Sequence, residues 1–189
     1  MEYTIIEALI SLKPEAEWAV RGGNYSDIVW LDKSQTKPTE QEIEEKIAEL
    51  NYQGEINVYQ EKRKLEYPDW GDQLDKIYHS GIDAWKADIK VIKDKYPKQT
   101  MDATELQKRK DTATFNLQKR NYEKAVARLA QYELSAGLKD EDGKHIIMPI
   151  AVEINGERNP LVVADETERA AAQEVINKTP QAVIESVSS

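Results

Sequence analysis

The chain has 189 residues, a formal net charge of -9 and no cysteine, which excludes disulfide bonds and thiolate metal sites. Such an acidic chain lacks the basic surface that broad binding to nucleic-acid phosphates requires. No stretch approaches the roughly 18 consecutive apolar residues of a membrane span, so we expect neither a nucleic-acid nor a membrane partner.

The first 34 residues predict a small β-rich unit. Segment 3–10 is consistent with a strand, because of its β-branched residues, or with a short helix, because of its Glu-Ala-Leu run. Segments 17–20 and 25–30 have strand character and flank Arg-Gly-Gly-Asn at 21–24, a sequence typical of hairpin turns. We therefore predict a hairpin with its two tryptophans, Trp18 and Trp30, in the core.

A helix is predicted to begin at a capping box. Thr39 and Glu42 have the spacing at which each side chain bonds a free backbone amide of the other residue. The helix is expected to continue to Glu66, although Gly54 weakens it by about 1 kcal/mol relative to Ala.

The next stretch, 67–98, is bounded by two Tyr-Pro pairs, and a proline disfavours helix at the residue before it. Asp69 is placed as an N-cap, and Gly81 interrupts the apolar pattern. The stretch therefore predicts a short helix, a bend and a longer amphipathic helix. The candidate partner-binding residues on these helices are Trp70, Leu74, Tyr78, Trp85 and Ile89. The alternative interpretation is that the turn at 72–75 serves only helix capping.

A second capping box, Asp102 with Glu105, predicts a long helix to about Leu134. Its second half carries an apolar stripe at coiled-coil-like spacing. We expect this stripe to pack on that of 82–96 as a helical hairpin. The stripe consists of Phe115, Tyr122, Val126 and Leu129.

The C-terminal part predicts a second hairpin followed by short helices. Strands are expected at 145–148, 150–154 and 161–163, around an Asn-Gly turn at 155–156. Asp165 with Glu168 is expected to open one helix, and Pro180 a last one. The overall prediction is an α+β fold in three parts: 1–66, 67–137 and 138–189.

Motifs for enzymatic chemistry are not found in the sequence. The two histidines, His79 and His145, are too few for a histidine-rich metal site. Asp140, Asp142 and Gly143 resemble half a calcium loop without its spacing or terminal Glu. We therefore expect a protein that is not an enzyme and that has no metal or cofactor.

Two blocks of the sequence resemble proteins of phage tails. The N-terminal block is similar to the small domain of the XkdW-like family in its Ala-Leu entry at 8–9, its Pro-x-Ala turn at 14–16, its Tyr-x-x-Ile-x-Trp strand at 25–30 and its Pro-Thr-x-x-Glu capping box at 38–42. The block at 63–79, with Tyr-Pro, Asp-Gln-Leu-Asp and Tyr-His, resembles a segment common in tailed-phage proteins. The chain departs from that segment at 69–71, where Asp-Trp-Gly replaces small or aliphatic residues.

The resemblance implies a tail-fibre or baseplate accessory protein, made in the bacterial cytoplasm and located in the virion tail. The expected partner is a tail-fibre or baseplate protein, bound through helical faces around Trp70 and Trp85, and self-association stays open. The alternative is a tail-fibre assembly chaperone that the virion does not retain. A third interpretation, an enzyme or regulator of another kind, has no motif in its favour.

Overall fold

The computed structural model describes residues 2–135, 153–154, 157–158 and 160–188. They form two compact units, 1–113 and 114–189, and the boundary falls inside one long helix. The described chain is mostly helical, at 74%, so the predicted α+β class is wrong. In the described ranges, strand structure is limited to two short antiparallel pairs, because nearly every long segment there carries helical periodicity and helix caps.

The N-terminal segment is a helix, α1 (Ile5–Leu12), which decides the alternative left open by the sequence. The helix forms because Thr4 and Glu7 make a full capping box: the Thr4 amide donates to Glu7 Oε2 at 2.8 Å, and the Thr4 hydroxyl accepts from the Ile6 amide. Its buried face, Ala8 and Leu9, supplies half of the buried core cluster of this unit.

The predicted N-terminal hairpin is present but short. Strand β1 (Trp18–Val20) pairs with β2 (Ile28–Trp30), and Trp18 lies opposite Trp30. The second strand begins at Ile28 because 25–27 forms a 3-10 turn, η1 (Tyr25–Asp27), capped by Asp27 accepting from the Asn24 amide. Both tryptophans are half-buried against the core that Ile28 completes.

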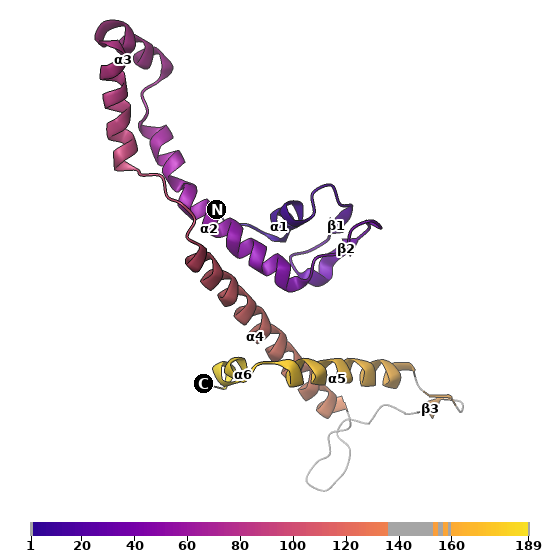
Figure 1. Ribbon diagram of the computed structural model, residues 1–189. Helices are drawn as coiled ribbons and strands as arrows, with labels where there is room; N and C mark the ends of the chain where they lie inside the picture. Colours follow the sequence, from indigo (N-terminus) through magenta and orange to yellow (C-terminus); the bar gives the residue numbers. More distant parts are fainter. Residues whose placement is uncertain (1, 136–152, 155–156, 159, 189) are drawn as a thin grey trace. The chain divides into compact units, whose positions relative to one another are not determined.

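Helix α2 (Glu40–Glu66) forms the long axis of the first unit. Its capping box at Thr39 and Glu42 is confirmed, and Ile43 packs in the core cluster with Ala8 and Leu9 of α1. Figure 1 shows α1 lying beside α2. The helix continues through Gly54. A Cβ at this position would lie only 3.3 Å from the Tyr3 ring. The absent side chain thus lets the N-terminal segment lie close to α2.

Helix α3 (Trp70–Lys95) follows a turn at Tyr67 and Pro68, and Asp69 caps it by accepting from the Asp72 amide at 2.9 Å. The predicted bend is confirmed at Gly81, which has φ 80° and ψ 165°, a conformation nearly restricted to glycine. α3 is therefore two helical segments, 70–80 and 82–95 (Figure 1).

Helix α4 (Ala103–Ser135) begins after Asp102, which accepts from the Glu105 amide at 2.8 Å. This is one half of the predicted capping box; the Asp102 amide donates to the Tyr52 hydroxyl and not to Glu105. The expected helical hairpin of 67–137 stays a prediction: α3 falls in the first compact unit, and the α4 stripe from Phe115 onward falls in the second. In the second unit Leu117 and Ala125 of α4 are buried, and Lys119 Nζ donates to the Ser186 carbonyl at 3.3 Å.

The C-terminal prediction is corrected most strongly. Residues 161–163, expected as a returning strand, lie in helix α5 (Pro160–Lys178), which begins before the predicted Asp165 cap. Proline suits the first turn of a helix, where its missing amide needs no partner. Among the described residues of this region, strands β3 (Glu153–Ile154) and β4 (Glu157–Arg158) have two residues each and pair antiparallel with each other. The predicted strand at 145–148 and turn at 155–156 lie outside the described residues.

The last helix, α6 (Gln181–Val187), begins after Pro180 as predicted. Its Val183 is nearly fully buried, so this short helix is held by packing as well as by its backbone bonds.

Candidate partner-binding site

All five predicted partner-binding residues lie on α3, but they do not share one surface. Trp70, Leu74 and Tyr78 are on the first segment at intervals of four residues, one helical turn apart. They expose 78%, 61% and 84% of their surface. We call these three side chains the α3 stripe.

The other two predicted residues, Trp85 and Ile89, face inward from the second segment of α3. Ile89 is 9% exposed, and the Trp85 indole Nε1 donates to Gln73 Oε1 at 3.1 Å. An ion pair between Lys76 Nζ and Asp88 Oδ2, at 3.0 Å, makes a second link between the segments. Trp85 and Ile89 therefore hold the α3 stripe in position instead of extending it.

The base of α3 is fastened to the end of α2. Arg63 Nε donates to the Tyr96 carbonyl at 2.8 Å, and its Nη2 donates to the Lys93 carbonyl at 3.0 Å. Helix C-termini leave such carbonyls without partners, and a guanidinium supplies them. Glu66 accepts from Lys95 and from the Tyr96 hydroxyl, and these hydrogen bonds lower the pKa of Glu66.

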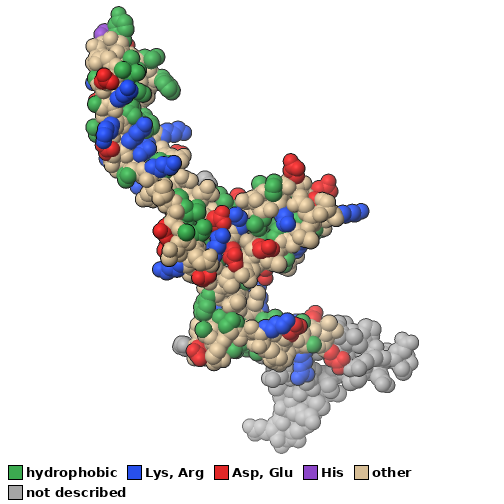
Figure 2. Space-filling model, in the orientation of Figure 1, with side chains coloured by type: hydrophobic (Ala, Val, Ile, Leu, Met, Phe, Trp, Pro, Cys, Tyr) green, Lys and Arg blue, Asp and Glu red, His purple; other side chains and the backbone are tan. Residues whose placement is uncertain are grey.

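The two segments of α3, 70–80 and 82–95, form a helical hairpin, and large apolar side chains are unusually exposed on and around it. Ile82 and Val91 of α3 and Leu65 at the end of α2 are exposed in addition to the α3 stripe. Figure 2 shows hydrophobic side chains at the far end of the region that α3 forms, and Lys or Arg side chains over the rest of that region. Contiguous exposed apolar surface on a folded chain marks interaction sites, and Trp and Tyr are the residue types enriched in binding hot spots.

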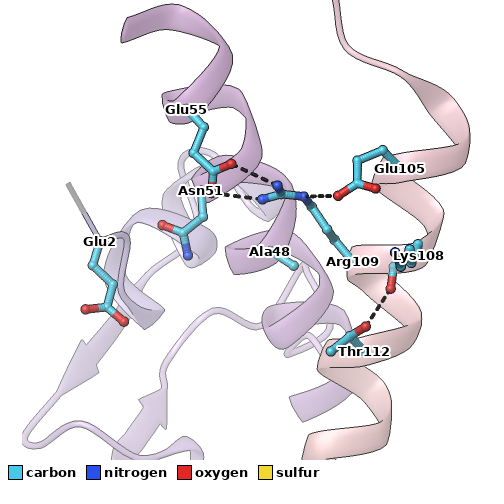
Figure 3. A pocket seen from close by; sticks show the side chains of 8 residues that line it. All are labelled: Glu2, Ala48, Asn51, Glu55, Glu105, Lys108, Arg109 and Thr112. Carbon is cyan, nitrogen blue, oxygen red and sulfur yellow. Dashed lines mark hydrogen bonds and ion pairs between the residues drawn. The ribbon is translucent and has the colours of Figure 1, made fainter.

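A hollow of about 560 Å³ between α2 and the start of α4 is the other candidate site (Figure 3). At its centre Arg109 makes a bidentate ion pair with Glu55: Nη1 and Nη2 lie 2.9 and 2.8 Å from the two carboxylate oxygens. Arg109 Nε donates to Glu105 at 2.9 Å, and the guanidinium lies over the Tyr52 ring. The hollow is lined by Glu2, Ala48, Asn51, Glu55, Glu105, Lys108, Arg109 and Thr112.

These contacts make the hollow a joint between two helices. The hydrogen bonds from Arg109 lower the pKa of Glu55, and the hydrogen bonds to Glu55 and Glu105 raise the pKa of Arg109, so Glu55 and Arg109 keep their charges. A guanidinium with both edges occupied has little capacity left for a ligand. We therefore take the α3 stripe, and not this hollow, as the candidate site.

Within the ranges that the structure describes, no group of acidic or histidine side chains is arranged to hold a metal ion. His79 makes an edge-to-face contact with Tyr78, at 4.9 Å between ring centroids. His145 and the half calcium loop at 140–143 fall outside those ranges. No helix among the described residues is long and apolar enough to cross a membrane.

Sequence reasoning missed the residues that hold the site in place. Arg63 and Gln73 were not predicted, because neither residue carries a local signal of a partner more than ten positions away. Arg109 has Glu105 four residues before it, which is a recognisable helical pair, but Glu55 is remote in the sequence.

Comparisons of the chain with protein-family models, with curated proteins and with solved structures found no match. The likeness to phage-tail sequences therefore stays a prediction.

Proposed function

We propose that this chain is a structural or accessory protein of a phage tail that binds a tail-fibre or baseplate protein through the α3 stripe. The observation that carries the proposal is the exposure of Trp70, Leu74 and Tyr78 on one line of a fastened helical hairpin. The phage-tail setting comes from the resemblance of residues 8–42 and 63–79 to tail sequences.

The surroundings of the stripe favour binding. Trp70 and Tyr78 bring large apolar area with few rotatable bonds, which keeps the entropy cost of docking low. The Trp85–Gln73 bond holds the two segments of α3 together, and the contacts of Arg63 fasten the second segment to the end of α2, before a partner arrives. A preorganised surface of this kind binds more tightly, because its side chains and backbone lose less conformational entropy when the partner docks.

Mass spectrometry of purified virions of the source phage tests the setting. A structural component is expected in the particle at a fixed ratio to the fibre protein. Absence from the particle, with co-purification on the fibre from infected cells, supports the chaperone alternative. Absence from both overturns the proposal.

A set of surface substitutions tests the site. Trp70→Ser, Leu74→Ser and Tyr78→Ser together are expected to abolish retention of the fibre or baseplate partner without changing helix content. Ile10→Ser with Leu31→Ser is the matched control, because both side chains are about half exposed, at 57% and 54%, in the N-terminal region. Partner retention by the triple variant, with its circular dichroism unchanged, assigns the function to another surface.

A further inference from the structure

We propose that the segment docked on the α3 stripe is an acidic amphipathic helix, with apolar residues along its centre and carboxylates at its edge. This inference rests on the proposed function, since it specifies the chemistry of that partner. The observation behind it is a row of lysines, Lys86, Lys90 and Lys93, along the second segment of α3.

The lysine row is exposed and loosely held. The chain as a whole has a net charge of -9, but segment 82–95 carries four lysines against three aspartates. The pairs of Lys86 with Asp83 and of Lys90 with Asp94 lie within one exposed helix, and pairs of this kind contribute little. Lys93 makes no ion pair within the described part of the chain. The row therefore presents positive charge that a partner carboxylate can engage.

The lysine row lies on the same side of the hairpin as the α3 stripe. One residue is a rotation of about 100° around a helix. Trp85, Ile89 and Ile92 face the contact between the two segments. The next residue after each of them is a lysine of the row, so all three lysines lie at the same edge of the second segment. Leu74 and Tyr78 likewise follow inward Gln73 and Ile77.

The ion pair on the other edge supports this placement. Lys76 and Asp88 each precede an inward residue by one position, and they meet at 3.0 Å. In two helical segments folded against each other, the edges that precede the contact line thus lie together. By the same geometry, the edges that follow the contact line are placed together on the opposite side; they carry Leu74 and Tyr78 on the first segment and the lysine row on the second.

An apolar line beside a line of ammonium groups matches an amphipathic helix with carboxylates next to its apolar face. In paired helices the apolar side chains supply most of the affinity, and opposite charges at the edge of the apolar face select the partner and its orientation. Nucleic acid is disfavoured as the occupant because the chain as a whole is acidic and lacks the broad basic surface that binding to phosphates requires.

The test uses two labelled synthetic helical peptides with the same leucine stripe. One has glutamates beside the stripe, and the other has lysines at the same positions. Fluorescence anisotropy with the full chain is expected to show roughly tenfold tighter binding of the glutamate peptide, weakened by added salt.

Charge reversal at Lys86→Glu with Lys90→Glu is expected to invert this preference. The control, Lys33→Glu with Lys124→Glu, changes the net charge equally at exposed lysines elsewhere and should leave the preference intact. Equal binding of the two peptides, binding of neither, or inversion by the control overturns the inference. So does a dimer in sedimentation that buries the α3 stripe.

These outcomes are separate from those that test the function. The chain can be a tail component that needs its α3 stripe while the peptides show no charge preference, in which case only this inference fails. A clear charge preference together with absence from virions and from fibre complexes leaves the inference standing and removes the phage-tail function.

Discussion

The indole N–H of Trp85 donates to the side-chain carbonyl of Gln73 at 3.1 Å, and this bond joins the two segments of α3 across the Gly81 bend. A residue predicted as part of the binding surface is thus part of its support.

We predict that Trp85→Phe weakens the hairpin by about 1 kcal/mol, the usual net value of one hydrogen bond. Hydrogen exchange of the α3 amides measures the change. In a Gln73→Met background the same substitution should cost clearly less, because the acceptor is already gone. Equal costs in both backgrounds would show that the hydrogen bond contributes nothing.

Gly81→Ala is predicted to destabilise the bend by about 1–3 kcal/mol, because a Cβ disfavours this backbone conformation. Crowding is not the reason, since a Cβ at Gly81 meets no atom within 4 Å. Spin labels at positions 75 and 90 report the distance between segments, and the chain has no native cysteine to interfere. We expect a broadened or longer distance. Gly23→Ala, equally open but without a positive φ, is the control.

Asp32 is predicted to titrate at unusually low pH. Hydrogen bonds from the Gln35 amide and from Ser34 lower the pKa of Asp32 from 3.8 to about 2. A lowered carboxyl pKa stabilises the fold above the unfolded-state pKa, and that contribution is lost as pH falls through the folded one. Asp32→Asn should therefore flatten the loss of stability between about pH 4 and pH 2. An NMR midpoint near 4 for Asp32 would contradict these hydrogen bonds.

Arg109→Lys is predicted to weaken the contact between α2 and the start of α4, because an ammonium cannot reproduce the bidentate ion pair with Glu55. The pKa of Glu55 should rise toward its ordinary value, which an NMR titration of the side chain measures. Arg21→Lys, at an exposed site, is the control and should leave that pKa unchanged. An unchanged Glu55 pKa in Arg109→Lys would assign its lowering to another group.

The features that could be predicted from the sequence are those whose signals are local. The capping box at Thr39, the Asp69 cap and the Gly81 bend each depend on residues within a few positions. Three of the five predicted site residues, those of the α3 stripe, are exposed together for the same reason: their spacing follows one helical face.

The features that could not be predicted depend on distant partners or on competing local signals. Arg63 and Tyr96 are 33 positions apart, and Arg109 and Glu55 are 54 apart, so no local pattern joins them. At 161–163 the β-branched residues favoured a strand, but Pro160 suits the first position of the helix that is actually formed. At 82–96 periodicity identified an apolar stripe without indicating which helix it would face.

The fastening of α3 at its base has a consequence for modularity. The chain enters the hairpin after Glu66 and leaves it at Tyr96, and Arg63 and Glu66 hold that exit point through direct hydrogen bonds. The two ends of residues 67–95 are therefore close together in space, so this segment can be removed or exchanged as one piece. We expect that a short glycine linker can replace residues 67–95 and leave α2 and the core beneath it folded.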